Sequence, residues 1–592
     1  MNQLYTKWGE SLDKENVMPE YPRPQMQRDS YYNLNGAWEY AITDNEIVTT
    51  YDGKITIPFS PESVLSGVNR FLDPNHTLSY HRIVRLPDDF IKSRLLLHFG
   101  AVDQEAIVYI DNQMAGTHKG GFTPFTLDIT DLVAGSEFAI DIRVKDVTDT
   151  SYMQTGKQRI KRGGIFYTSQ SGIWQTVWIE SLPADHITDF RFVPNFDQQR
   201  IEINFETNSD QPKYPIRVKV YYQGKLLQKA ETPSDNIVVA LKEWHPWTPE
   251  APDLYDIEIE YGEDLIKSYF GMRKFERKPD SFGIMRFFLN NKPYFLPGVL
   301  DQGYYPDGLL TPPSDEAMEA DIILMKQMGF HLIRKHIKLE PLRWYYHCDR
   351  LGMIVWQDIP SGSEKKDIAT NGILAQFGVN IQDKHYRWFG RKEEAGRIQF
   401  ESEVKEAINH LKNCVCISTW VPFNEAWGQF DSLRISESIA KTDPTRQIDH
   451  ASGWSDQGGG DFYSRHIYFS KIKFSRKKAY ERILALTEFG GYSLLVEGHS
   501  FNPSKVYGYK KFTDKAKLEV ALINLYDKEI LPAIEKGLSV LIYTQLSDVE
   551  DEVNGLVTYD RKYVKFDIEN MRQINKYLLQ AFKASLKSGM NK

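Results

Sequence analysis

The sequence predicts a multidomain β plus α/β protein, with an N-terminal jelly-roll β-sandwich, an immunoglobulin-like β-sandwich and a C-terminal (β/α)8 TIM barrel. Three observations predict this architecture. The chain has 592 residues, too many for a single hydrophobic core. Apolar residues recur with period two up to about residue 278, after which short strand-like runs alternate with helical patterns. Phe, Tyr and Trp make up 13% of the chain, which suits β-rich domains.

The first predicted domain, residues 1–182, consists of short alternating runs separated by turns. The stretch "RLLLHFGAVDQEAIVYIDNQMAG" is predicted to form strands joined by turns, with Asp111 and Asn112 at a hairpin tip. "FAIDIRVKD" and "TVWIESL" follow as further strands. Many short strands with Gly and Pro between them indicate a jelly-roll sandwich.

The second predicted domain, residues 183–278, has the length of an immunoglobulin-like sandwich. Its alternating runs include "RIEINFET", "IRVKVYYQG" and "LYDIEIEYG". No Cys–Trp–Cys pattern is present, so the sequence supports only the general sandwich architecture.

The third predicted domain, residues 279–592, alternates strands with helices. After the strand in "KPYFLPGV", Ser314 and Asp315 can cap a helix that places Ala317, Ile322 and Met325 on one face. The domain contains about eight such units in all, and no Gly-rich dinucleotide turn follows the first strand, so a barrel fits better than a doubly wound sheet. In such barrels the active site lies at the carboxyl ends of the strands.

Composition excludes several classes of function. The net charge is −8 with no long Lys/Arg block, so we expect no nucleic acid partner. No apolar run is long enough to cross a membrane, and the opening "MNQLYTKWGESLDKENVMPE" lacks an apolar signal core. Cys348, Cys414 and Cys416 are expected to be unpaired core thiols, the last two on one face of a strand. We therefore expect a cytoplasmic protein, unless an export signal has been removed, and neither a metal nor a cofactor.

The positions that follow each predicted barrel strand carry polar and aromatic side chains. Because the carboxyl ends of parallel strands meet at one mouth, these residues are candidates for the site. They are Asp301, Arg334, His336, Asp358, Asn424, Glu425, Trp454, His466, Tyr468, Glu488 and Tyr543.

Two of these positions are carboxylates that close strongly apolar strands. Glu425 is placed near strand four and Glu488 near strand seven, so the two carboxyls can face each other and flank a glycosidic bond. A separation of about 5–5.5 Å would make a retaining pair and about 6.5–9.5 Å an inverting pair. Glu425, beside Phe423 and Trp427, resembles a buried acid, whereas hydrogen bonds from groups such as Tyr468 would keep Glu488 ionised as the nucleophile.

Each of these residues also has a structural interpretation. A single Glu after a strand is usually a helix-capping or ion-pairing residue. His336 and His466 taken singly are commonly packed or capping residues. It is the combination of two such carboxylates with polar and aromatic neighbours that favours catalysis.

The motifs resemble those of family two glycoside hydrolases, the group of β-galactosidases, β-glucuronidases and β-mannosidases. "FNEAWGQF" and "LTEFGGYS" resemble its acid/base and nucleophile segments. "LNGAWEY", "GGFTPFTLDIT" and "SGIWQTVWIE" resemble its sugar-binding jelly roll, and "WTPEAPDLYDIEI" and "FGMRKFE" its immunoglobulin-like domain. "GFHLIRKHIKLEPLRWYYHCDRLGMIVWQDIP" and "YTQLSDVEDEVNGLVTYDR" resemble its barrel, so the likeness covers essentially the whole chain.

The resemblance implies retaining hydrolysis of an oligosaccharide or glycoside through a covalent glycosyl-enzyme. It implies that Glu488 is the nucleophile, that Glu425 is the acid/base, and that Asn424 bonds the sugar 2-hydroxyl. Tyr468 falls near the Tyr that contacts the nucleophile, and Tyr543 lies where many members have a stacking Trp.

Several specificity positions depart from the best-known members of that family. "VLDQGYY" and "KHIKLEP" replace their motifs after the first two barrel strands, so Asp301, Gln302 and His336 are expected to line the sugar subsite differently. The Asn-x-Lys carboxylate clamp of glucuronidases is absent after the last strand. We therefore expect an exo-acting enzyme for a terminal β-linked neutral sugar, with a β-galactoside favoured.

The sequence leaves several alternatives open. β-Mannosides, β-glucuronides, arabinosides and galactofuranosides remain candidate substrates, and a transglycosidase would use the same residues. A non-catalytic carbohydrate-binding protein would need one carboxylate lost, and a metal-dependent hydrolase would need a His/Asp cluster with ligand spacing. The oligomeric state, a homo-oligomer included, is also open.

Overall fold

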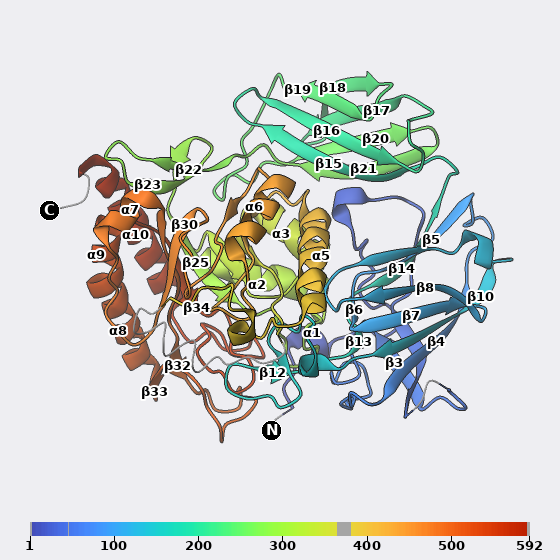
Figure 1. Ribbon diagram of the computed structural model, residues 1–592, viewed down its shortest axis with the longest axis horizontal. Helices are drawn as coiled ribbons and strands as arrows, with labels where there is room; N and C mark the ends of the chain where they lie inside the picture. Colours follow the sequence, from blue (N-terminus) through green and yellow to red (C-terminus); the bar gives the residue numbers. More distant parts are fainter. Residues whose placement is uncertain (1–2, 45–46, 364–379, 589–592) are drawn as a thin grey trace.

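The computed structural model describes residues 3–44, 47–363 and 380–588. Two β-sandwiches lie against a (β/α)8 barrel, one beside it and one above it in the view of Figure 1. The predicted architecture is therefore confirmed. Within the described ranges, no helix combines the length and apolar character that a bilayer crossing requires.

The N-terminal sandwich consists of two antiparallel sheets with one core between them. β10 shows why they form, because every second residue of this strand points into that core: Phe138, Ile140, Ile142 and Val144. The first sheet has the order β1 (Tyr31–Asn33), β14 (Val177–Leu182), β5 (Arg94–Phe99) and β9 (Phe125–Asp128). The second has the order β3 (Gly53–Ile57), β2 (Gly36–Thr43), β4 (Thr77–Arg85), β10 (Glu137–Lys145), β7 (Glu105–Ile110) and β8 (Gln113–Lys119).

The hairpin between β7 and β8 turns at Asp111 and Asn112, as the sequence predicts. Both residues have left-handed backbone angles, with φ of 46° and 65°. Two consecutive left-handed residues are what a tight two-residue hairpin requires, and Asp and Asn tolerate them better than most residues.

The immunoglobulin-like sandwich has a three-stranded and a four-stranded antiparallel sheet around a separate core. The first contains β15 (Ile187–Asn195), β16 (Arg200–Thr207) and β19 (Asn236–Ala240). The second contains β18 (Lys225–Thr232), β17 (Ile216–Tyr222), β20 (Tyr255–Tyr261) and β21 (Asp264–Phe270). A small sheet of β22 (Phe275–Pro279), β23 (Met285–Leu289) and β24 (Lys292–Pro293) leads into the barrel, so it spans the predicted boundary at residues 278–279.

Residues 3–30 run along the other two domains before the chain enters the strands of its own sandwich. The backbone amide and hydroxyl of Thr6 donate to Asp307 of the barrel at 2.8 and 2.7 Å. Further on, Gln27 pairs with Lys267 at the edge of the immunoglobulin-like sheet. This segment therefore ties the three domains together.

The barrel strands are parallel and buried on both faces, which explains their nearly continuous apolar sequences. In barrel order they are β25 (Leu296–Asp301), β26 (Leu332–Lys335), β27 (Ile354–Asp358), β28 (Ile417–Val421), β29 (Gln447–Ile448), β30 (Phe462–Ile467), β31 (Ile483–Gly490) and β34 (Leu538–Thr544). The seam between β29 and β30 is bridged by a hydrogen bond from the Asp461 amide to the Ile448 carbonyl, 2.8 Å long.

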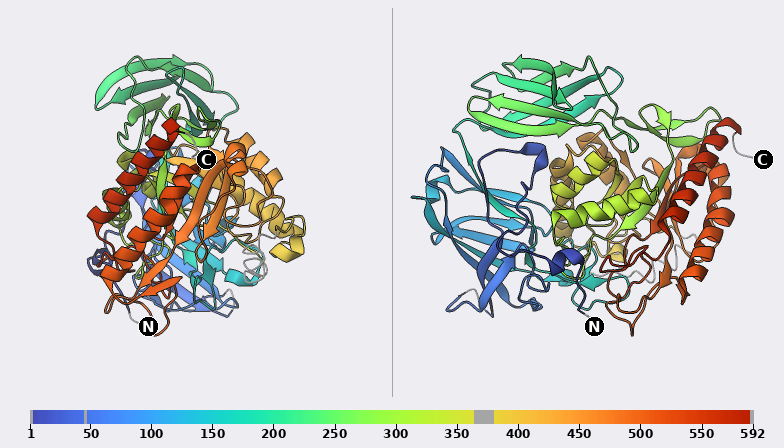
Figure 2. Two further views of the ribbon diagram at one scale, coloured as in Figure 1. Left: turned by 90° about the vertical axis from the view of Figure 1, so that its left-hand side faces the viewer. Right: turned by 180° about the vertical axis from the view of Figure 1, so that it is seen from behind.

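Helices cover the outside of the barrel, and Figure 2 shows the C-terminal ones along one side. The Ser314 side chain accepts a hydrogen bond from the Ala317 amide and caps the first of them, as predicted. The helices are α2 (Asp315–Gln327), α3 (Leu342–Leu351), α5 (Glu394–Leu411), α6 (Ser432–Thr442), α7 (Arg476–Glu481), α8 (Lys515–Leu525), α9 (Leu531–Glu535) and α10 (Ile568–Ser588).

The three cysteines are free and buried in the barrel, as predicted. The expected strand around Cys414 and Cys416 begins later than predicted, because β28 starts only at Ile417. The Cys416 amide instead donates to the Asp349 carboxylate at 2.6 Å, which fixes the turn before the strand.

Candidate active site

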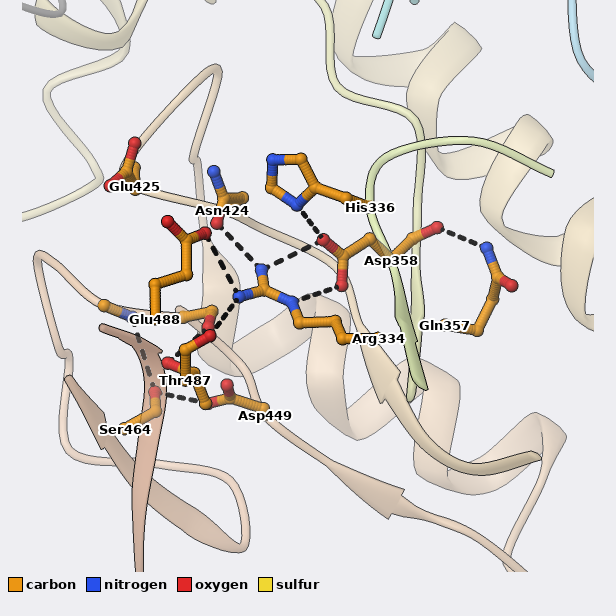
Figure 3. A network of polar contacts seen from close by, with 12 residues as sticks. Arg334, His336, Gln357, Asp358, Asn424, Glu425, Asp449, Ser464, Thr487 and Glu488 are labelled. Carbon is orange, nitrogen blue, oxygen red and sulfur yellow. Dashed lines mark hydrogen bonds and ion pairs between the residues drawn. The ribbon is translucent and has the colours of Figure 1, made fainter. Parts of the chain in front are cut away.

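Arg334 is the centre of a buried polar cluster at the carboxyl ends of the barrel strands (Figure 3). Its guanidinium binds both oxygens of Asp358 at 2.9 Å and donates to Asn424 Oδ1 at 2.8 Å. Its Nη1 lies 3.4 Å from Glu488 Oε1 and 3.3 Å from the Thr487 carbonyl. One planar cation on β26 therefore orients groups from β27, from β31 and from the loop after β28.

Glu425 lies in the loop after β28, where the backbone is strained. Glu425 and Ala426 have φ of 49° and 62°, in the left-handed region that non-glycine residues avoid. The Glu425 amide donates to the Ser452 carbonyl at 2.9 Å, and the Trp427 amide to the Asn424 carbonyl at 2.9 Å. These contacts hold the turn that carries the Glu425 carboxylate, and Figure 3 shows this residue near Glu488.

Glu488 lies within β31 and faces the barrel interior. The Tyr468 hydroxyl donates to its Oε2 at 2.5 Å and lies 3.1 Å from Thr544 Oγ1. The Tyr468 ring stacks on Tyr509, with centroids 3.6 Å apart and nearly parallel planes. The stacking fixes the hydroxyl, so Glu488 receives a rigidly held hydrogen bond.

His466 lies between the two carboxylates. Its Nδ1 is 2.8 Å from Glu425 Oε1 and 3.5 Å from Glu488 Oε2. Its Nε2 faces Nη1 of Arg334 at 3.4 Å, and guanidinium can only donate. Nε2 must therefore be the acceptor, and Nδ1 carries the hydrogen that is donated to Glu425. Burial lowers the pKa of His466 to about 4, so this neutral form prevails.

The two carboxylates are close together. One oxygen of Glu425, one of Glu488 and a ring nitrogen of His466 all lie within 4.8 Å of one another. A closest oxygen–oxygen approach of no more than 4.8 Å is nearer to the roughly 5–5.5 Å between the carboxyls of retaining glycosidases than to the roughly 6.5–9.5 Å of inverting enzymes. The same three residues could hold a metal ion by geometry alone.

The two carboxyls differ in the groups that counteract the effect of burial on their pKa. Burial raises the pKa of Glu425 to about 7, although the charges of Lys157 and Arg334 act in the opposite direction. Burial also raises the pKa of Glu488, and the charge of Glu425 acts in the same direction, whereas Arg334 and the Tyr468 hydrogen bond lower it. Glu425 is thus suited to donate a proton near neutral pH.

Most of the residues predicted from strand ends meet in this cluster. Asn424 accepts from Arg334, but its Nδ2 is buried with no partner among the described residues and is free to donate to a ligand. His336 Nδ1 lies 2.9 Å from Asp358, which fixes its ring beside the guanidinium. The cluster thus brings together Arg334, His336, Asp358, Asn424, Glu425, His466, Tyr468 and Glu488.

Trp454 lies beside the cluster rather than within it. Its ring centroid is 6.4 Å from that of His466. The neighbouring Gly453 lies so close to His466 that an added Cβ would be 2.5 Å from its Cγ. Trp454, His466, Tyr468 and Phe469 line a groove of about 690 Å³ that opens from the site.

Two predicted site residues point elsewhere. Asp301 is opposite Lys335 in the sheet and pairs with its ammonium on the outward face of the strands. Tyr543 packs against Phe489, with ring centroids 5.7 Å apart, and is 1% exposed. Both predictions of substrate contact are corrected, because alternate residues of a strand face opposite sides of the sheet.

Sequence reasoning missed several contributors. Thr544, the neighbour of Tyr543, supplies the inward-facing hydroxyl beside Tyr468. Ser452 holds the Glu425 backbone, and Tyr509 stacks on Tyr468 from a loop far along the chain. Lys157 approaches from the N-terminal sandwich. Strand-end position could have found Ser452 and Thr544, but no local pattern marks Tyr509 or Lys157.

Curated relatives include enzymes of more than one specificity. The chain is 22% identical over 433 residues to a β-glucuronidase of Streptococcus agalactiae, covering 68% of each chain. It is 24% identical over 400 residues to a β-galactosidase of Thermoanaerobacter pseudethanolicus, covering 62% of this chain and 47% of that one. The chain thus spans about half the length of the second relative.

Solved structures share the fold over nearly the whole chain. A β-glucuronidase from an uncultured Clostridium matches with a TM-score of 0.71 and 17% identity, covering 94% of this chain and 99% of that one. A β-galacturonidase from Eisenbergiella tayi matches with a TM-score of 0.68 and 17% identity, covering 95% and 98%.

Family models match the three domains in order. The sugar-binding domain of glycosyl hydrolases family 2 matches residues 2–183, a second domain of that family residues 185–273, and its TIM barrel domain residues 285–485. The chain therefore belongs to family 2 of the glycosyl hydrolases.

Proposed function

We propose that this chain is an exo-acting, retaining glycoside hydrolase that removes a terminal β-linked sugar by double displacement. The observation that carries the proposal is the facing pair Glu425 and Glu488, with carboxylate oxygens within 4.8 Å of each other. Family membership and the curated relatives support the reaction class.

In the first step Glu488 attacks the anomeric carbon and the glycosidic bond breaks. Glu425 delivers its proton to the departing oxygen, so no alkoxide has to leave. Arg334 and the Tyr468 hydroxyl hold the Glu488 carboxylate in the attacking orientation. The product of this step is a glycosyl ester on Glu488 and a free leaving group.

In the second step water hydrolyses that ester. Glu425, now ionised, takes a proton from the water as it attacks the anomeric carbon, and Glu488 leaves as a carboxylate. The His466 Nδ1 hydrogen bond at 2.8 Å stabilises the ionised form of Glu425 at this stage. Asn424 Nδ2 is the donor that we assign to the sugar 2-hydroxyl.

The groove beside the site is proposed to hold the leaving group. It is lined by Trp454, Tyr468 and the exposed Phe469, and aromatic faces pack well against sugar rings or aryl groups. Free buried cysteines support the cytoplasmic location that we propose for the protein.

Product stereochemistry tests the mechanism directly. We expect proton NMR to show the β-anomer as the first sugar released from an aryl β-glycoside, before mutarotation. Initial release of the α-anomer would exclude the double displacement. The sequence favours a neutral β-galactoside, whereas the relatives are named as glucuronidases and galactosidases, so the assay needs aryl β-glycosides of both kinds.

A further inference from the structure

A loop of the N-terminal sandwich reaches the mouth of the barrel. The amides of Thr155 and Gly156 both donate to the Ser361 carbonyl, at 3.0 and 2.8 Å, just beyond the end of β27. Gly156 lies so close to the backbone after β26 that an added Cβ would be 2.8 Å from the Ile337 oxygen. In Figure 1 the short strand β12 (Tyr167–Thr168) of this region lies beside the barrel, apart from its own sandwich.

Lys157, the next residue, lies against the acid/base side of the candidate site. It is 7% exposed, and its Nζ is 4.8 Å from the ring centroid of Trp427. Trp427 is two residues from Glu425, and its ring centroid is 6.5 Å from that of His336. The ammonium therefore lies on the side of the candidate site where Trp427 packs near His336 and Glu425.

Among the described residues this ammonium has only aromatic partners, since its Nζ also lies 5.9 Å from the ring centroids of Phe166 and Tyr167. Among the residues that the structure describes, no carboxylate lies within 4.0 Å of Lys157 Nζ and no acceptor is hydrogen-bonded to it. Burying an ammonium without a partner is unfavourable, so buried lysines are normally paired.

Two other buried lysines of the barrel mouth show the usual arrangement. Lys338 donates to the Gly303 carbonyl at 2.7 Å, to the Leu310 carbonyl at 2.7 Å and to Glu340 at 2.8 Å, which uses all three of its hydrogens. Lys335 pairs with the carboxylates of Asp301 and Glu340. Lys157 differs from both, although all three are at least nine-tenths buried.

Other unpaired groups near Lys157 are also donors. Trp427 Nε1 and Asn424 Nδ2 are buried without a hydrogen-bond partner among the described residues. Arg334, the other cation of the site, already donates to Asp358, Asn424, Thr487 and Glu488. An incoming group rich in acceptor oxygens would satisfy this side of the site.

The field of Lys157 reaches the groups at the site floor. Burial lowers the pKa of His336 well below its usual value, and the Lys157 charge lowers it further. The same charge acts to lower the pKa of Glu425, against the effect of burial, which raises it to about 7. The ammonium is thus close enough to influence a ligand placed between these residues.

We propose that Lys157 is a specificity-determining residue that binds a negatively charged oxygen group, a carboxylate or a sulfate, on the terminal sugar. The proposal rests on the function proposed above. A substrate anion in this site would otherwise meet the carboxylates of Glu425, Glu488 and Asp358 with no uncommitted cation, and Lys157 supplies one. The absence of a clamp on the last barrel loop therefore does not exclude an acidic sugar, since the cation comes from another domain.

Matched pairs of sugars and of variants test the role of Lys157. Aryl β-glucuronide and β-glucoside, β-galacturonide and β-galactoside, and 6-sulfated and unsulfated galactosides differ only in the anionic group. We expect the wild-type chain to favour the anionic member of at least one pair in kcat/KM, by about 10-fold or more for a charge-assisted hydrogen bond. The preferred pair distinguishes carboxylate from sulfate.

In Lys157→Gln that preference is expected to fall to roughly threefold or less, through loss on the anionic substrate alone. Lys157→Arg should retain it, and so should Lys161→Gln, which removes the same charge from an exposed position of the same loop. Thermal unfolding of each variant establishes that it is folded.

A wild-type preference for the neutral member of every pair, or a preference that survives Lys157→Gln, would overturn the proposal while leaving the hydrolase function intact. If the wild-type chain hydrolyses none of the substrates, the proposed function fails. Calorimetric titration with free D-glucuronate, D-galacturonate and galactose 6-sulfate against D-glucose and D-galactose then decides the role of Lys157 by the same criteria, without turnover.

Discussion

Two buried clusters of charged side chains are centred on adjacent residues of one strand, Arg334 and Lys335 of β26. Arg334 faces the barrel interior and organises the inner cluster, which contains Arg334, Asp358, Asn424, Glu425, His466 and Glu488. Lys335 faces the helices and organises the outer cluster, which contains Asp301, Lys335, Lys338 and Glu340. Both lie at the carboxyl ends of the strands and both are buried, so burial and charge alone do not distinguish them.

The clusters differ in how completely their charges are compensated. In the outer cluster the Lys335 charge holds the pKa of Asp301 below its usual value, although burial by itself would raise it. In the inner cluster burial prevails, and the pKa values of Glu425 and Glu488 are raised. The outer cluster thus stabilises the fold with ionised pairs, whereas the inner one retains carboxyls whose protonation can change during a reaction.

Replacement of Glu488, in the inner cluster, should cause the largest loss of activity while leaving the fold intact. Glu488→Gln removes the proposed nucleophile while keeping the side-chain shape, so we expect kcat for an aryl β-glycoside to fall by about 10⁴-fold or more. The folded structure should persist, as far-UV circular dichroism and thermal unfolding would show. Near-normal turnover would eliminate Glu488 as the nucleophile.

Replacement of Glu425 should have a smaller effect that depends on the leaving group. Glu425→Gln removes the proposed acid, so we expect a loss of about 10²- to 10⁴-fold in kcat/KM for a poor leaving group such as an alkyl alcohol. A 2,4-dinitrophenyl glycoside, which leaves without a proton, should lose much less. Equal losses for both substrates would argue against proton donation by Glu425.

The pH dependence of activity should reflect the raised pKa of Glu425 in the inner cluster. Glu425 donates a proton only in its neutral form, and burial raises its pKa to about 7. Activity should therefore fall as the pH rises through that value, by about 10-fold in kcat/KM between pH 6 and pH 8. The alkaline limb should disappear in Glu425→Gln. A limb that persists in this variant would assign it to another group.

Disruption of the outer cluster should affect stability but not chemistry. Lys335→Met leaves Asp301 buried without its cation, and breaking a buried pair in this way costs about 3–5 kcal/mol of unfolding free energy. Chemical denaturation would measure this loss. We expect kcat/KM per folded molecule to stay within about twofold of the wild type, because Lys335 touches no inner-cluster group. A loss as large as that of Glu425→Gln would show that the clusters are coupled.

The fold and the two carboxylates could be predicted because they follow from local periodicity. Period-two runs predicted the sandwiches, and the apolar runs before Glu425 and Glu488 predicted their positions just after strand four and in strand seven. Asp301 and Tyr543 were misassigned because strand ends could be located to within a residue, whereas side-chain direction reverses at each residue. Lys157 was missed because only tertiary structure brings a sandwich loop to the barrel mouth.

The backbone conformation at Glu425 lowers the stability of the protein at a position that the proposed catalysis requires. Two consecutive left-handed residues, Glu425 and Ala426, each store roughly 1–3 kcal/mol that glycine would release. Glu425→Gly would therefore be a more thermostable protein without its acid. Directed evolution for heat resistance alone would drift toward such inactive chains, so a stabilised catalyst requires selection for turnover in every round.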